Sequence, residues 1–123
     1  MSNLSTTDGP IVPPAGAGLV SSLLTRCYSV IEGELVVGEC AIGELVACYG
    51  TPLFVYDHQV LLRQLRLLRD TLPSSFGIHY SVKANPNQAI LRAFLDAGVH
   101  LEIASAGELH QALAAGCEPQ HIL

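Results

Sequence analysis

The chain has 123 residues, a formal net charge of −5 and a composition that is 50% hydrophobic and only 14% charged. This length suits about one small domain, and the apolar content is enough to form a core. The negative charge and the absence of a basic cluster argue against a nucleic-acid partner, which needs Lys and Arg opposite its phosphates. No apolar run approaches the ~20 residues of a membrane-spanning helix, so we expect no membrane partner.

The N-terminal part of the chain divides into two segments. Residues 1–27 are rich in Ser, Thr, Pro, Gly and Ala, which predicts a disordered arm. The stretch YSVIEGELVV alternates around a Glu-Gly turn and predicts a β-hairpin over 28–37. Next, CAIGELVACYG predicts a short helix that ends at Gly50, so hairpin and helix together occupy 28–50.

Residues 51–123 alternate predicted strands with predicted helices. Four apolar runs of strand length, PLFVY, FGIHYSVK, VHLEIA and HIL, begin about every 23 residues, a repetition typical of parallel βαβ units. A (β/α)₈ barrel needs about 250 residues. We therefore expect an α/β fold that is the N-terminal part of a TIM-like barrel, truncated in the fourth strand. The alternative is a small self-contained α/β domain.

The helices between these strands carry recognisable boundary signals. Asp57 is the expected N-cap of the first helix, which shows a stripe of leucines at positions 61, 65, 68 and 72. Asn85 is the expected N-cap of the second helix, with Pro86 as its first residue. Ser105 and Glu108 form the capping box that opens the third, so each has a local structural role to begin with.

The only lysine of the chain, Lys83, ends the second predicted strand. Alternation assigns Phe76, Ile78, Tyr80 and Val82 to one face and Gly77, His79, Ser81 and Lys83 to the other. If the apolar face meets the helices, Lys83 points into the barrel at its C-terminal end, where barrel enzymes place their chemistry. Partial desolvation there would favour the neutral amine that condenses with an aldehyde. The alternative is a lysine that extends into water.

The third predicted strand places a carboxylate near the same end. Alternation puts Glu102 on the inward face, beside Lys83, where it could bind a ligand or orient the lysine; the alternative is a solvated strand-end glutamate. The histidines show no ligand spacing, and the four cysteines show neither CxxC spacing nor clustering with histidine, so we expect no metal. We interpret the cysteines as buried free thiols of a cytoplasmic protein without a signal peptide.

Three segments, GTPLFVYD, YSVKANPNQAILRAFLDAG and LEIASAGELHQALAAG, resemble the N-terminal part of fold-type III pyridoxal-phosphate decarboxylases. This family includes the diaminopimelate, ornithine and arginine decarboxylases, and the resemblance covers about residues 33–123 in the family's order and spacing. It implies an alanine racemase-like barrel, pyridoxal 5′-phosphate as cofactor and decarboxylation of an amino acid. The SAGEL segment is nearest the diaminopimelate branch. The Tyr-Gly-His-Gly run of alanine racemases is absent after Asn85.

The resemblance also implies roles for individual residues. Lys83 matches the lysine that forms the Schiff base with the cofactor. Glu102 matches an acidic residue near the cofactor, where the family usually has aspartate. Ser105 and Glu108 match residues at the start of the following helix that are expected to bind the cofactor with them.

The family's remaining machinery has no counterpart in this sequence. The glycine-rich phosphate loop, the carboxylate that pairs with the pyridine nitrogen and the second domain are missing, so we expect the chain to be inactive alone. By resemblance, segment 28–50 would join a C-terminal β-domain, and the whole protein would be a homodimer acting on an amino acid. The alternatives are another decarboxylase of the family, of the ornithine, arginine or biosynthetic-cluster type, and a non-catalytic regulatory relative.

Overall fold

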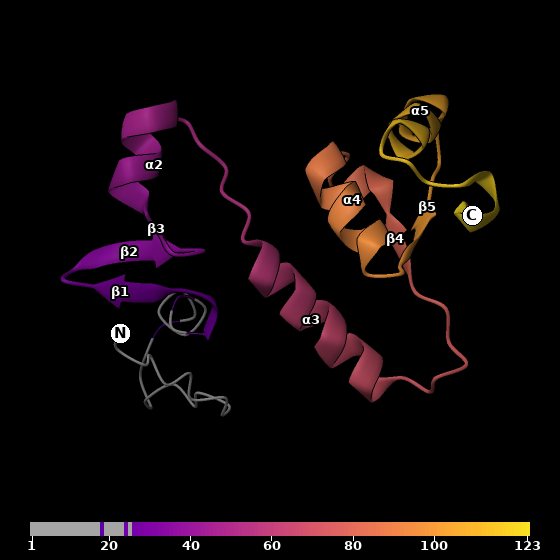
Figure 1. Cartoon of the computed structure of the whole chain (residues 1–123), viewed down its shortest axis with the longest axis horizontal. Helices are drawn as coiled ribbons and strands as arrows, with labels where there is room; N and C mark the ends of the chain where they lie inside the picture. The colour runs from indigo at the N-terminus through magenta and orange to yellow at the C-terminus, as the bar shows by residue number, and fades with distance from the viewer. Residues whose placement is uncertain (1–17, 19–23, 25) are drawn as a thin grey trace. The chain divides into compact units, whose positions relative to one another are not determined.

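The computed structural model describes Gly18, Leu24 and residues 26–123 (Figure 1). The chain forms two compact units, Met1–Asp57 and His58–Leu123. The expected disordered arm lies almost wholly outside the described residues, although Leu24, Arg26 and Cys27 are helical. Among the residues that the structure describes, no helix is both long and apolar enough to cross a membrane.

The first unit contains a three-stranded antiparallel sheet in the order β1-β2-β3. Its strands are β1 (Ser29–Ile31), β2 (Glu34–Val37) and β3 (Cys40–Ala41), and the predicted hairpin is confirmed. The β1–β2 and β2–β3 connections are both two-residue turns with positive φ. The φ angles are 52° at Glu32 and 84° at Gly33 in the first turn, and 57° at Gly38 and 70° at Glu39 in the second. Such turns match the twist of hairpin strands, so Gly38 is the sequence signal for the third strand β3, which was not predicted.

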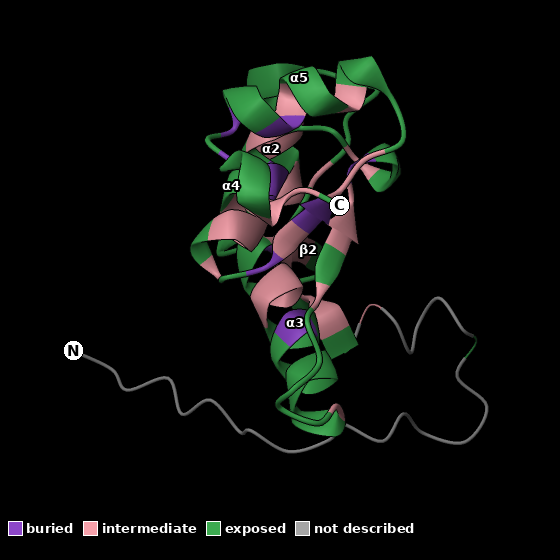
Figure 2. Ribbon diagram, turned by 90° about the vertical axis from the view of Figure 1, so that its right-hand side faces the viewer, coloured by how far each residue is buried: buried purple, intermediate pink, exposed green. Residues whose placement is uncertain are grey.

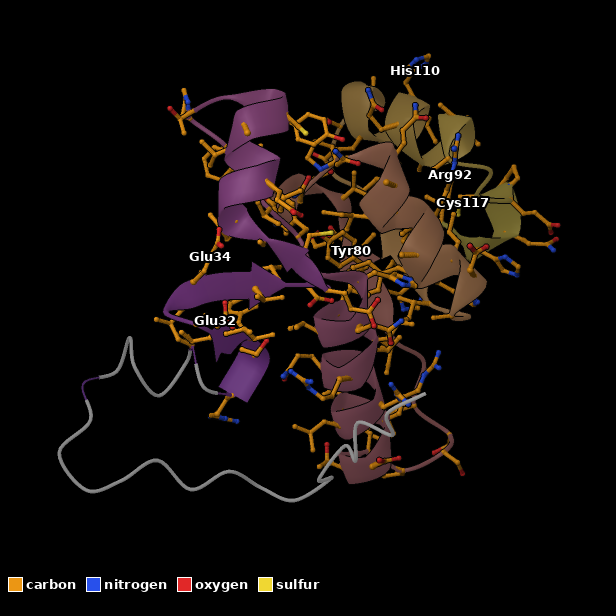
Figure 3. All side chains as sticks on the ribbon, turned by 60° about the vertical axis from the view of Figure 1, so that its left-hand side comes forward. Glu32, Glu34, Tyr80, Arg92, His110 and Cys117 are labelled. Atoms are coloured by element: carbon orange, nitrogen blue, oxygen red, sulfur yellow. The ribbon has the colours of Figure 1, made fainter. Side chains whose placement is uncertain are left out.

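The predicted short helix of the first unit is also confirmed. Helix α2 (Ile42–Tyr49) follows β3 directly and ends at Gly50, whose φ is 76°. The backbone N–H of Gly43 in its first turn donates to Oε1 of Glu34 at 2.8 Å, so a β2 side chain caps the helix (Figure 3). Ala41 at the N-cap position makes no side-chain hydrogen bond itself.

The prediction of a strand over PLFVY is wrong for this structure. Residues 51–57 contain no strand, and Phe54 is 84% exposed. A β-strand exists only through hydrogen bonds to a neighbouring strand. None of the strands that the structure describes pairs with this segment.

The second unit follows the expected alternation of helices and strands (Figure 1). Strand β4 pairs with β5 in parallel, in the register His79↔His100, Tyr80↔Leu101 and Ser81↔Glu102. A single parallel bridge from Leu101 to Ile122 marks the start of the predicted fourth strand. The elements are α3 (His58–Thr71), β4 (His79–Ser81), the 3₁₀ helix η1 (Val82–Ala84), α4 (Gln88–Asp96), β5 (His100–Glu102), α5 (Ala106–Ala114) and the 3₁₀ helix η2 (Pro119–His121).

The core of this unit lies between the β4–β5 pair and helices α4 and α5 (Figure 2). Val82, Leu91 and Leu101 are completely buried there, and Tyr80 stacks on Phe94 of α4 with ring centroids 4.1 Å apart. Ala112, Ala115 and Cys117 complete the cluster. Tyr80 and Val82 of the apolar face predicted from alternation therefore pack in this core as expected, whereas Phe76 lies before the strand and is 62% exposed.

The second helix starts two residues later than predicted. Asn87, not Asn85, is the N-cap of α4, and its Oδ1 accepts a hydrogen bond from the N–H of Ala89 at 2.9 Å. The residue before a proline is pushed to extended conformations, and Asn85 has φ −162° and ψ 108°. Its Oδ1 accepts from the N–H of Asn87 at 3.0 Å, a local turn that leads the chain into the cap.

The expectation of four buried thiols is only partly correct. Cys117 is buried, whereas Cys40 and Cys48 are exposed and Cys27 is half-buried; all four are free. Cys117 follows the glycine that ends α5 and packs into the core cluster. The other three belong to the first unit, where Val37 is the one buried apolar residue among those described.

Candidate functional site

The candidate site is the edge of the second unit at which the parallel strands β4 and β5 end. Because the strands are parallel and in register, the residues at their C-terminal ends lie side by side. Val82 and Leu101 face the helices and are completely buried. Ser81 and Glu102 belong to the opposite face, as the alternation of side chains predicted.

Ser81 and Glu102 form a direct hydrogen bond across the two strands. The hydroxyl of Ser81 donates to Oε2 of Glu102, and both side chains are half-buried. Removing one partner of a hydrogen bond to a charged group costs about 1.5–3 kcal/mol. Partial exposure reduces that figure. Sequence reasoning placed Ser81 on this face but assigned it no role, since the bond depends on the register between strands.

Lys83 lies just beyond the end of β4, two residues after Ser81. The strand is shorter than predicted, and Lys83 belongs to the 3₁₀ helix η1, which follows it. Its side chain is exposed, so the expected desolvation is not found in this structure. A two-stranded sheet leaves open the face that the other strands of a barrel would enclose. The hydrogen bond of Glu102 goes to Ser81 rather than to Lys83.

Ser105 and Glu108 form the predicted capping box at the start of α5. The N–H of Glu108 donates to Oγ of Ser105 at 3.2 Å, and that hydroxyl donates to Oε1 of Glu108 at 3.1 Å. The other carboxylate oxygen accepts from the N–H of Ala104 at 2.9 Å. Both side chains are thus occupied in fixing the helix start, directly after β5.

Three histidines, from β4, β5 and the 3₁₀ helix η2, lie in a row. The rings of His79 and His100 meet edge to face with centroids 5.2 Å apart, and His100 stacks on His121 at 4.5 Å. The sequence shows no ligand spacing among them. Parallel register pairs His79 with His100, and the chain after α5 brings His121 beside them. Within the part of the chain that the structure describes, no group of histidine, cysteine or acidic residues could hold a metal ion.

A cavity of about 340 Å³ in the second unit lies away from this site. It is lined by the α3–β4 connection together with Arg69, Gly98 and His100. These residues are at the N-terminal ends of the strands, opposite to Lys83. Barrel enzymes carry out their chemistry at the C-terminal ends, so this cavity is not the candidate active site.

Comparisons with known proteins agree with the resemblance seen in the sequence. A diaminopimelate decarboxylase from Zymomonas mobilis is 36% identical over 100 residues, which cover 78% of this chain and 24% of that protein. A second, from Methanothermobacter thermautotrophicus, is 36% identical over 95 residues, which cover 75% of this chain and 22% of that protein. The chain thus spans about a quarter of the length of these relatives.

Solved structures give the same fold. The crystal structure of AQ1208 from Aquifex aeolicus matches with a TM-score of 0.72 and 30% identity, over 80% of this chain and 25% of that one. A diaminopimelate decarboxylase from M. jannaschii matches with a TM-score of 0.73 and 23% identity, over 81% of this chain and 25% of that one. The second likeness shows the fold alone.

The family model for the pyridoxal-binding domain of pyridoxal-dependent decarboxylases matches residues 58–123. Its first residue is also the first residue of the second compact unit. The matched region contains the lysine segment, both parallel strands and the capping box of α5. Because this match covers more than half of the chain, the chain belongs to the pyridoxal-dependent decarboxylase family.

Proposed function

We propose that this chain carries the cofactor lysine of a pyridoxal-phosphate-dependent amino-acid decarboxylase of the diaminopimelate type. The observation that carries the proposal is the position of the single lysine at the C-terminal end of a parallel strand, in the pyridoxal-binding domain. The curated relatives at 36% identity are named diaminopimelate decarboxylases, which supports that substrate class. Other decarboxylases of the family are the alternative.

The residues at this edge fit the cofactor's aldehyde. Lys83 offers an exposed primary amine, which is the group that condenses with an aldehyde. Completely buried Val82 precedes it and fixes the turn that carries it. Pyridoxal phosphate, when bound, supplies the electron sink for breaking the bond between Cα and the carboxylate. Lys83 would hold the cofactor and exchange it with the substrate amine.

Three further residues are proposed to bind the cofactor with Lys83. Glu102 brings a half-buried carboxylate to the same edge. Ser105 and Glu108 act there through the start of α5, which their hydrogen bonds fix in place. A carboxylate can hold the lysine ammonium near the strand ends before the reaction.

The wider assembly is proposed on the same basis. The second unit would form the first βα units of an eight-stranded barrel, and segment 28–50 would pack with a C-terminal β-domain. The match of residues 58–123 to the pyridoxal-binding domain supports the barrel part of this arrangement, and the packing of segment 28–50 follows from the family resemblance. The whole protein would be a cytoplasmic homodimer that acts on a small amino acid.

Reductive trapping tests the proposal on the full-length protein that contains this sequence. Incubation with pyridoxal phosphate followed by borohydride should attach the cofactor to Lys83, which mass spectrometry of the lysine peptide would show. Because residues 1–123 contain no second lysine, a label on a lysine of this region identifies Lys83. We expect faster labelling of Lys83 in the folded than in the urea-unfolded protein, and none at this position in Lys83→Arg.

Turnover is the second readout. In the full-length protein that contains this sequence, Lys83→Ala should abolish both the absorbance of the bound cofactor and the release of CO₂. Equal labelling of Lys83 in the folded and unfolded full-length protein, or turnover by the alanine variant, would refute the assignment.

A further inference from the structure

The hydrogen bond between Ser81 and Glu102 lies close in the chain to Lys83 and fixes the position of the Glu102 carboxylate. The two residues are direct partners in the parallel register, and their side chains share the face opposite the core. Lys83 follows Ser81 by two residues, with Val82 between them. The hydrogen bond from Ser81 therefore fixes the Glu102 side chain next to the start of η1, the turn that carries Lys83.

Ser81 is itself held by the core on both sides along the chain. Tyr80 stacks on Phe94, and Val82 is completely buried. The serine side chain is also short, with a single rotatable bond to its oxygen. Its hydroxyl is thus a donor in a defined place, whereas an unbonded glutamate has several rotamers open to it.

Glu102 needs such a partner because of its length. A glutamate carries its carboxylate one methylene farther from the backbone than the aspartate that the family resemblance leads us to expect. The extra bond adds a torsion, and the hydrogen bond to Ser81 selects one of the resulting positions. The bond occupies Oε2, and among the described residues Oε1 has no hydrogen-bond partner.

We propose that Ser81 is a positioning residue, which holds the Glu102 carboxylate so that its second oxygen serves Lys83 or the cofactor bound there. This inference rests on the proposed function of Lys83. Ser81 and Glu102 act together, because the position of the long Glu102 side chain depends on its hydrogen bond to Ser81. Ser81 itself does not touch the reacting atoms.

An unfolding cycle tests the contact without any cofactor. The variants are Ser81→Ala, Glu102→Gln and the double variant of the 123-residue chain, unfolded in urea. If the bond is made in solution, the two single substitutions are non-additive by about tenfold in the unfolding equilibrium constant, equivalent to ~1.4 kcal/mol. Additive effects would overturn the proposal.

The labelling rate of Lys83 in the full-length protein tests the positioning role. Ser81→Ala should slow trapping of pyridoxal phosphate on Lys83 by roughly fivefold, a coupling typical of residues in contact. Ser81→Thr keeps the hydroxyl and should restore the rate, while Glu102→Asp should not reach Ser81 and should be slow. In the Glu102→Gln background, Ser81→Ala should have no further effect. Ser75→Ala, an exposed serine of the preceding loop, is the matched control.

The outcomes separate this inference from the proposed function. If Lys83 of the unchanged full-length protein is labelled no faster in the folded than in the unfolded state, the proposed function fails and the positioning role fails with it. If Lys83 is labelled but Ser81→Ala behaves like Ser75→Ala, only the inference on Ser81 fails. An undiminished effect of Ser81→Ala in the Glu102→Gln background would likewise show that the serine acts through another group.

Discussion

The two compact units of the chain are stabilised in different ways. In the first unit, strands close in sequence are joined by two-residue turns, and among its described residues Val37 is the one buried apolar side chain. In the second unit, β4 and β5 are separated by a whole helix and meet over a core of completely buried residues. Antiparallel neighbours can pair through turn geometry, whereas parallel strands depend on a covered face.

Both units leave some large apolar residues exposed, such as Phe54 in the first and Phe76 in the second. The units differ in what they bury. In the second unit Val82 and Leu101 are completely buried beneath α4 and α5, whereas Val37 is the one buried apolar residue among the described residues of the first. We therefore expect the second unit to respond strongly to core substitutions, and the first to respond mainly to changes in its turns.

The largest effect should come from the core of the second unit. Leu101→Ala removes a completely buried side chain from β5 and should destabilise this unit by about 2–5 kcal/mol. Urea unfolding followed by circular dichroism measures the change. Leu113→Ala, on the exposed side of α5, is the matched control and should stay within about 0.5 kcal/mol. Equal losses from both substitutions would contradict the core described here.

A turn substitution should have a smaller effect, confined to the first unit. Glu32 has a φ of 52°, a left-handed conformation that asparagine adopts more easily than glutamate. Glu32→Asn creates an Asn-Gly turn and should stabilise the β1–β2 hairpin by up to about 1 kcal/mol. Hydrogen exchange of the β1 and β2 amides measures it. Glu32→Gln keeps the long side chain, so an equal gain from glutamine would rule out the conformational explanation.

The smallest free-energy effect concerns Cys117. Burial, and secondarily the negative charge of Glu118, raise the pKa of this thiol above its ordinary value of 9.0. Above pH ~9 the unfolded chain loses this proton before the folded chain does, so stability should fall as pH rises through that range. Urea titrations on either side of pH 9 check the decline, and Cys117→Ala should lack this component. A steeper decline in the alanine variant would contradict it.

The reactivity of the cysteine thiols should also differ between the two units. At neutral pH, exposed Cys40 and Cys48 should react readily with an alkylating reagent, whereas buried Cys117 should react only as the second unit opens. Leu101→Ala should therefore accelerate the labelling of Cys117 and leave that of the other two unchanged.

Prediction from the sequence was accurate where the signal was local. The Glu-Gly turn predicted the hairpin, and the capping box at Ser105 predicted the start of α5. Prediction was wrong where the secondary structure depends on a neighbouring strand, or where a proline restricts the backbone of the residue before it. PLFVY has the composition of a strand but no strand partner, and the proline after Asn85 moves the cap to Asn87.

The candidate site shows the same division. Alternation correctly separated Ser81 and Glu102 from the buried face, because side chains of a strand alternate regardless of its neighbours. It gave Lys83 a place in the strand, but the strand ends before it, and the lysine is exposed. The bond from Ser81 to Glu102 and the row of histidines were not foreseen, since both depend on register.

The sequence by itself determined the hairpin, the alternation of helices and strands after residue 58, the faces of the strands and the single lysine side chain available to an aldehyde. These follow from periodicity, turn residues and composition, which act over a few neighbouring residues. Only the tertiary structure decided which side chains of β4 and β5 meet, and hence that Glu102 bonds to Ser81. Strand register is set by the packing of Val82 and Leu101 against α4 and α5, and that packing joins residues far apart in the chain.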